Sequence, residues 1–341
     1  MSDVAALLES TALRATRRRV GLALGYTAPD GRVTTSAAGR LHLPDGATPD
    51  AGSRFEIGSI TKTFTALALA RAVVDGDVTL DTPVGELVPE VAGLGRDGHP
   101  VTLGHLATHT SGLPRVHLSA LRGTVDALRG IDPYRAHTEE VFLAAVAAGR
   151  LRRTPGTGRP AYSNSGFGLL GLALARRAGT PYAGLIGSTV TGPLGLTDTG
   201  TRAEASPEQT ARTAVGHFRR RTPAAAWNLD ALPGAGALLS TVTNQLTWAR
   251  AHLDPPSGEL GEAVRLALTP HGRRIGLAWQ LTSTATETPV GTDHVVWHSG
   301  GTGGFRTMLC LRPDVGDALV LLSNHTRSVA LLGFRLLAAI R

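Results

Sequence analysis

The chain has 341 residues, of which 42% are hydrophobic and 18% charged, with a formal net charge of +7 at pH 7. This length allows a large core and two lobes, and the composition excludes a disordered chain or one that spans a membrane. The arginines are scattered, and the clusters at 17–19 and 219–221 are too short for a nucleic-acid groove. The one cysteine, Cys310, excludes an internal disulfide and lies in an apolar stretch typical of a buried thiol.

The N-terminal segment 1–19 has a helical apolar pattern with its basic cluster after the apolar residues. A secretory signal has the opposite order, with basic residues before the apolar run. No stretch of the chain reaches the length of a membrane span. The sequence therefore predicts a cytoplasmic protein that does not bind membranes.

The remaining elements alternate between strand and helix patterns along the chain. Strand-like runs at both ends with helices between them predict an α+β fold, in which both chain ends build one antiparallel sheet. We expect a single domain, 1–341, with terminal helices beside the sheet and an active site between the lobes. The sheet lobe covers about 1–55 and 270–341, and the inserted, mostly helical lobe covers about 56–269. The predicted strands are 20–26, 32–38, 275–281, 294–298, 305–311 and 318–322, and the predicted helices include 61–75, 141–151, 166–178, 245–253 and 329–340.

One basic residue differs from all the others, because Lys62 is the only lysine in the chain. An arginine keeps its proton at any pH that a protein meets, whereas a lysine amine can give its proton up. Ser59 lies three residues before Lys62, in the first turn of the predicted helix 61–75, so both side chains share one face. This spacing indicates a serine nucleophile next to its base.

Three further segments follow in order: 102–114, the triplet Tyr162-Ser163-Asn164, and the triplet His298-Ser299-Gly300. Together with Ser59 and Lys62 they resemble the serine β-lactamase and penicillin-binding-protein superfamily, specifically its class C β-lactamase-like branch. That branch also includes esterases, D-aminopeptidases, D-alanyl-D-alanine peptidases and transacylases. The resemblance runs from about residue 20 to 325 and implies a β-lactamase/transpeptidase-like fold.

The resemblance assigns roles to these residues. It implies an acyl-enzyme on Ser59, and an oxyanion hole formed by the backbone N–H groups of Ser59 and Gly301. Tyr162 and Lys62 would jointly deprotonate Ser59, with the phenol pKa lowered by the charges of Lys62 and His298. We expect Asn164 to orient Lys62 and the substrate amide. His298, Ser299 and Gly300 would bind and orient the substrate.

Relatives that are β-lactamases usually begin the third motif with lysine, and this chain has His298 there. Histidine carries at most a partial charge near neutral pH, so a fixed cation for a substrate carboxylate is weakened. This departure favours a serine hydrolase that cleaves an ester or amide of a small intracellular molecule. It disfavours a β-lactamase or a D-alanyl-D-alanine carboxypeptidase, as does the missing export signal.

Several alternatives stay open at this stage. A transacylase would pass the same acyl group to an amine or alcohol, and a catalytically dead binding protein would use only the fold. His105 and His109 are four residues apart, but Leu106 takes the place of the glutamate in a zinc-binding motif, so we predict no metal. The glycines at 300–304 do not form a dinucleotide fingerprint, and we expect no cofactor. The expected partner is a small-molecule ester, amide or lactam, and the sequence is silent on oligomeric state.

Overall fold

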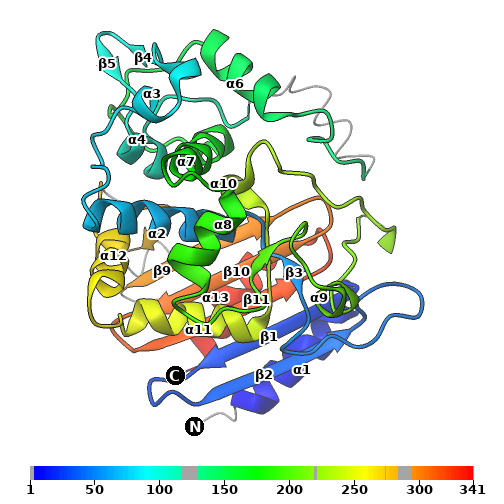
Figure 1. Ribbon diagram of the computed structural model, residues 1–341. Helices are drawn as coiled ribbons and strands as arrows, with labels where there is room; N and C mark the ends of the chain where they lie inside the picture. Colours follow the sequence, from blue (N-terminus) through cyan, green and yellow to red (C-terminus); the bar gives the residue numbers. More distant parts are fainter. Residues whose placement is uncertain (1–3, 117–129, 219–220, 273, 283–293, 341) are drawn as a thin grey trace.

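The computed structural model describes residues 4–116, 130–218, 221–272, 274–282 and 294–340. Its centre is a six-stranded sheet in the order β2-β1-β11-β10-β9-β8, and every adjacent pair of strands is antiparallel. Strand β1, near the start of the chain, pairs directly with β11, near its end (Figure 1). The prediction of one antiparallel sheet built from both chain ends is confirmed. The strands are β1 (Gly21–Thr27), β2 (Val33–Gly39), β8 (Gln280–Thr282), β9 (Val295–Gly301), β10 (Arg306–Arg312) and β11 (Asp317–Ser323).

The strands β1, β10 and β11 are buried on both faces of the sheet, since their side chains alternate between two sides and each side carries a core. Leu22 and Leu24 of β1 pack with Leu319 and Leu321 in one core, beneath the two terminal helices α1 (Val4–Thr16) and α13 (Ala330–Ala339). The alternate residues, such as Val320, belong to the larger core on the opposite face, which the inner helices cover. The predicted terminal helices therefore flank the sheet, as expected.

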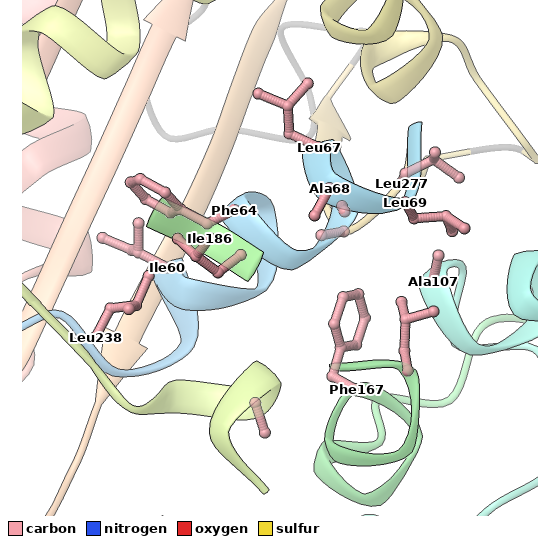
Figure 2. Close-up of a cluster of buried hydrophobic side chains, with 14 of the residues drawn as sticks. Ile60, Phe64, Leu67, Ala68, Leu69, Ala107, Phe167, Ile186, Leu238 and Leu277 are labelled. Carbon is pink, nitrogen blue, oxygen red and sulfur yellow. The ribbon is translucent and has the colours of Figure 1, made fainter. Parts of the chain in front are cut away.

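Helix α2 (Thr61–Val74) is buried all round its first ten residues, Thr61–Ala70. A helix without a polar face has to be enclosed by protein, and Figure 2 shows side chains of α2 facing Phe167, Leu277 and other apolar residues on several sides. The ring of Phe64 stacks on that of Trp248, with centroids 3.9 Å apart. This enclosure holds the start of α2 in one place, and the turn directly before it, η1 (Gly58–Ile60), carries Ser59.

The remaining elements lie above α2 in Figure 1, or beside it and the sheet. The helix α11 (Val242–Leu253) packs against the sheet on the face opposite α1, although it falls inside the predicted helical lobe. The boundaries of the two lobes stay a prediction. These elements are β3 (Phe55–Glu56), η1 (Gly58–Ile60), α3 (Val84–Leu87), η2 (Pro89–Val91), β4 (Gly95–Arg96), β5 (His99–Pro100), α4 (Leu103–Ala107), α6 (Glu139–Ala148), α7 (Asn164–Arg177), α8 (Tyr182–Ile186), η3 (Gly187–Thr191), β6 (Gly200–Thr201), α9 (Pro207–Ala211), α10 (Pro233–Gly236), β7 (Leu238–Ser240), α11 (Val242–Leu253) and α12 (Glu259–Leu268).

Two kinds of boundary differ from prediction. The strand expected at 275–281 is a strand only from Gln280, because Leu277 and Ala278 donate their backbone N–H groups to Ala267 and Ala107 instead of to the sheet. The inner helices begin two to three residues before their predicted starts, because capping side chains precede them. The caps are Thr138 for α6, Ser163 for α7 and Thr241 for α11. Within the described ranges, no helix has both the length and the apolar character to cross a bilayer.

Candidate active site

Ser59 lies in the single turn η1 that leads directly into α2, one turn before Lys62. The Lys62 Nζ is 3.0 Å from Ser59 Oγ and donates a hydrogen bond of 2.5 Å to the carbonyl oxygen of Ala235 in α10. Its side chain is completely buried. Burial, with a smaller contribution from the charge of Arg115, holds the pKa of Lys62 well below its ordinary value. A neutral amine next to Ser59 can accept the proton of the hydroxyl.

Strand β9 runs directly against the residues that precede Ser59. A Cβ built on Gly300 would lie 1.8 Å from the carbonyl oxygen of Ile57, and one built on Gly58 would lie 2.6 Å from the backbone nitrogen of Gly301. Gly58 also has φ +53°, a conformation that side chains disfavour. Thr307 of β10 donates a hydrogen bond of 2.8 Å to the same Ile57 oxygen. The backbone of Gly301 is therefore brought close to Ser59, and the oxyanion hole of these two N–H groups stays a prediction.

Tyr162 comes to Ser59 from the segment just before α7. Its hydroxyl hydrogen-bonds with Ser59, and the centre of its ring is 4.9 Å from Lys62 Nζ. Burial raises the pKa of Tyr162 to about 12, although the contact with Ser59 and the charge of Arg115 lower it in part. The expectation that neighbouring cations lower this pKa is therefore wrong, because desolvation outweighs them. At neutral pH the phenol keeps its proton.

His298 of β9 is buried, and its Nδ1 lies 2.9 Å from the carbonyl oxygen of Ser299. Because a carbonyl only accepts, Nδ1 carries the proton and Nε2 presents a lone pair. Burial, and then the charge of Lys62, lower the pKa of His298 to about 3. The imidazole is therefore neutral at physiological pH, and the expectation of a weakened positive charge at this position is confirmed.

Asn164 is the first residue of α7, and its backbone N–H donates to the carbonyl oxygen of Arg115 at 2.8 Å. Its side chain hydrogen-bonds with Tyr134, while Oδ1 is buried without a partner among the described residues. The predicted contact of Asn164 with Lys62 is not formed, because the amine bonds to Ser59 and Ala235 instead. The orienting of a substrate amide by Asn164 stays a prediction. Its unpaired Oδ1 could accept a hydrogen bond from such an amide.

His109 belongs to the site although the sequence indicated only a weak metal motif there. Its Nδ1 accepts a hydrogen bond of 3.2 Å from the backbone N–H of Ser163, and its ring centroid is 4.5 Å from that of Tyr162. His105, by contrast, faces away and caps α4 together with Thr102. Among the described residues, no group of three or more potential ligands is placed to hold a metal ion. The motif order of segment 102–114 could have indicated His109, but its contact with the tyrosine could not be read from spacing.

These side chains open into one cavity of about 1440 Å³. The predicted residues Ser59, Tyr162, Asn164 and His298, Ser299, Gly300 and Gly301 all line it, and Lys62 is buried behind Ser59. Arg115 and Tyr134 also line the cavity, and sequence analysis singled out neither of them. The arrangement can therefore bring a nucleophile, a buried amine with a lowered pKa, a phenol proton donor and the edge of a strand to the same substrate.

The comparisons with known proteins agree with this geometry. The chain is 28% identical to the D-alanyl-D-alanine-carboxypeptidase/endopeptidase AmpH of Escherichia coli K12, over 78% of this chain and 69% of that protein. It is 29% identical to penicillin-binding protein 4 of Amycolatopsis lactamdurans, over 92% and 83% of the two chains, and 36% identical to esterase EstB of Burkholderia gladioli over 46% and 40%.

Solved structures show the same fold. A class C β-lactamase superposes with a TM-score of 0.84 at 20% identity, covering 100% of this chain and 97% of that chain. A D-alanine carboxypeptidase AmpC from Burkholderia cenocepacia gives a TM-score of 0.83 at 22% identity, covering 99% of each chain. The model of the Beta-lactamase family matches residues 9–339, nearly the whole chain. The chain belongs to the Beta-lactamase family of serine hydrolases.

Proposed function

We propose that this protein is a serine hydrolase that forms an acyl-enzyme on Ser59 and cleaves an ester or amide of a small molecule. The observation that carries the proposal is the buried amine of Lys62, 3.0 Å from Ser59 Oγ. This amine is the kind of base that a serine nucleophile needs, and it is available without a metal or cofactor. The similarity to carboxypeptidases, penicillin-binding proteins and an esterase supports the same class of chemistry.

The first half-reaction follows from the positions of three side chains. Lys62 accepts the Ser59 proton as Oγ attacks the substrate carbonyl carbon, and the backbone N–H groups of Ser59 and Gly301 stabilise the oxyanion. The neutral phenol of Tyr162 then donates its proton to the departing oxygen or nitrogen, as the bond to the carbonyl carbon breaks. The Lys62 ammonium returns a proton to Tyr162, so the site ends neutral with the acyl group on Ser59.

Water completes the reaction in a hydrolase. With the base regenerated, Lys62 accepts a proton from the attacking water as the water oxygen bonds to the acyl carbon. Lys62 then returns a proton to Ser59 Oγ as the ester bond breaks, which releases the acid and restores the serine hydroxyl. A transacylase would use an amine or alcohol in place of water, and the size of the cavity, about 1440 Å³, leaves room for such an acceptor beside the acyl group. The neutral His298 supplies no fixed charge at the third motif, so a substrate carboxylate is not held by a cation at that position.

Intact-mass measurement after brief exposure to 4-nitrophenyl acetate tests the proposal. We expect an acetyl adduct on the unmutated protein and on Ser188→Ala, an exposed serine outside the cavity, and none on Ser59→Ala. An adduct that persists in Ser59→Ala would show that another residue is the nucleophile. Turnover that rises on adding an amine, with the acetylated amine as product, would identify a transacylase. The predicted cytoplasmic location is tested separately by cell fractionation.

A further inference from the structure

The charged side chains that line the cavity at Ser59 are positive, as far as the structure describes them. Five arginines line it, and none of its described lining residues is an aspartate or glutamate. The arginines are Arg115, Arg152, Arg159, Arg274 and Arg306. Cations gathered in a concave site attract an anionic ligand, because the low-dielectric walls focus their field into the cavity.

Arg115 is the member of this set that lies at the reacting groups. Its guanidinium carbon is 5.2 Å from the centre of the Tyr162 ring, and its side chain is exposed to the cavity. Its backbone is held in place, since its carbonyl oxygen accepts the N–H of Asn164 at the start of α7. No carboxylate among the described residues forms an ion pair with Arg115. The guanidinium is therefore positioned by its backbone and by the Tyr162 ring.

The other basic groups near Ser59 do not offer a charged donor to a ligand beside Tyr162. Lys62 is enclosed, and its amine contacts Ser59 and the Ala235 carbonyl. His298 donates its one ring proton to the carbonyl oxygen of Ser299. Arg306 pairs with Gly301 across β10 and β9, and its Nη1 donates to the carbonyl oxygens of Thr302 and Phe305, which braces the loop after β9. The charge offered to a ligand beside Tyr162 thus comes from Arg115.

We propose that the substrate carries an anionic group, a carboxylate or a phosphate, which the guanidinium of Arg115 binds from the wall opposite the third motif. This inference rests on the proposed function and names its substrate class: an ester or amide with a negative charge close to the scissile bond. The planar guanidinium can donate two parallel hydrogen bonds to either group. The other arginines raise the local concentration of such substrates at the mouth of the cavity.

Matched esters test the inference. Phenyl acetate is compared with 3-acetoxybenzoate and 3-acetoxyphenyl phosphate, which carry the charge on the leaving group, and phenyl hexanoate is compared with monophenyl adipate, which carries it on the acyl group. We expect kcat/KM, normalised to the rate with hydroxide, to favour at least one anionic ester by about ten-fold. In Arg115→Gln the ratio of anionic to neutral kcat/KM falls to about one, mainly through KM, as expected for a lost charge-assisted hydrogen bond.

Arg32→Gln is the matched control, since Arg32 lies in the exposed turn between β1 and β2 and pairs only with Asp30 among the described residues. The preference should survive in this variant and decrease with added NaCl. Equal ratios in Arg115→Gln and the unmutated protein, or no preference for any anionic ester, would overturn the inference.

A binding measurement separates this inference from the proposed function. Calorimetric titration of adipate into Ser59→Ala, and into Ser59→Ala with Arg115→Gln, needs no turnover. Binding that requires Arg115, in a protein that hydrolyses none of the esters, would support the anion site and count against the hydrolase. Ester turnover that depends on Ser59 without any anionic preference would support the hydrolase and refute the anion site.

Discussion

Replacing Gly300 with alanine should separate strand β9 from the segment that carries the nucleophile. The added Cβ would lie 1.8 Å from the carbonyl oxygen of Ile57 and 2.3 Å from Thr307 Oγ1. Real Cβ atoms essentially never approach other atoms within 3.0 Å, so the contact with Ile57 has to lengthen from 1.8 Å to at least that value. The obstruction is backbone on one side and a buried hydroxyl on the other, so no flexible side chain can rotate away.

The displacement has two measurable effects. It moves Gly301 away from Ser59 by about 1 Å, and misplacement on this scale lowers kcat/KM by about 100-fold. It also breaks the hydrogen bond of 2.8 Å from Thr307 to Ile57 and strains the packing, which lowers the free energy of unfolding by about 1–3 kcal/mol. Hydrolysis of an activated ester measures the first effect, and urea denaturation measures the second.

Gly187→Ala is the control for this prediction. Gly187 has a helical backbone with φ −56°, and no heavy atom lies within 4 Å of the place that an added Cβ would take, so the methyl group meets no obstruction. We expect this variant to keep its activity and to be at least as stable as the unmutated protein. A Gly300→Ala variant whose kcat/KM and unfolding midpoint match those of Gly187→Ala would refute the reasoning.

Four further predictions concern the base, its pH dependence, the proton donor and the core. Lys62→Arg should lower the acylation rate by about 10²–10⁴, because arginine cannot give up its proton, and stopped-flow acylation measures this loss. In the unmutated protein kcat/KM should rise with pH as the ammonium of Lys62 loses its proton, at a pH below the ordinary lysine pKa of 10.5. The same rise should be present in Tyr162→Phe. If the rise is absent in that variant, Tyr162 is the base instead of Lys62. Tyr162→Phe itself should slow alkyl esters and amides more than 4-nitrophenyl esters, since only poor leaving groups need the phenol proton. Asp317→Asn should lower the free energy of unfolding by about 3–5 kcal/mol in urea denaturation, because the buried Arg312 loses its counter-ion. In the unmutated protein the Arg312 Nε donates to Asp317 at 2.8 Å. A smaller decrease in the free energy of unfolding than that of Gly300→Ala would contradict this prediction.

Much of this site could be predicted because its chemistry restricts residue type. Ser59 lies in the turn η1, which leads directly into α2, so three residues of spacing already place it beside Lys62. Tyr162 and Gly300 come from other parts of the chain, and only the order of motifs connected them with Ser59. The structure brings both to the segment that carries Ser59.

The charge states could not be predicted in the same way. The pKa of Tyr162 depends on how completely the surrounding chain excludes water, and its basic neighbours alone would have suggested the opposite direction. Arg115 was missed for a related reason, since nothing local distinguishes it from the other arginines of this chain. Its importance arises from the 5.2 Å approach to the Tyr162 ring, which is a tertiary contact.

The pairing of a strand near the start of the chain with one near its end also has a consequence during biosynthesis. Ser59, Lys62 and Tyr162 leave the ribosome well before Gly300 and Gly301, and β1 finds its neighbour β11 only when the chain is almost finished. Until then β1 presents an unpaired edge, which is a site for premature association with other chains. A nascent or truncated chain that ends before β9 therefore holds nucleophile and base but lacks the wall of the site that faces them. The wall of the site that faces Ser59 forms only when β9 has folded against it, so we expect a chain that ends before β9 to be acylated more slowly.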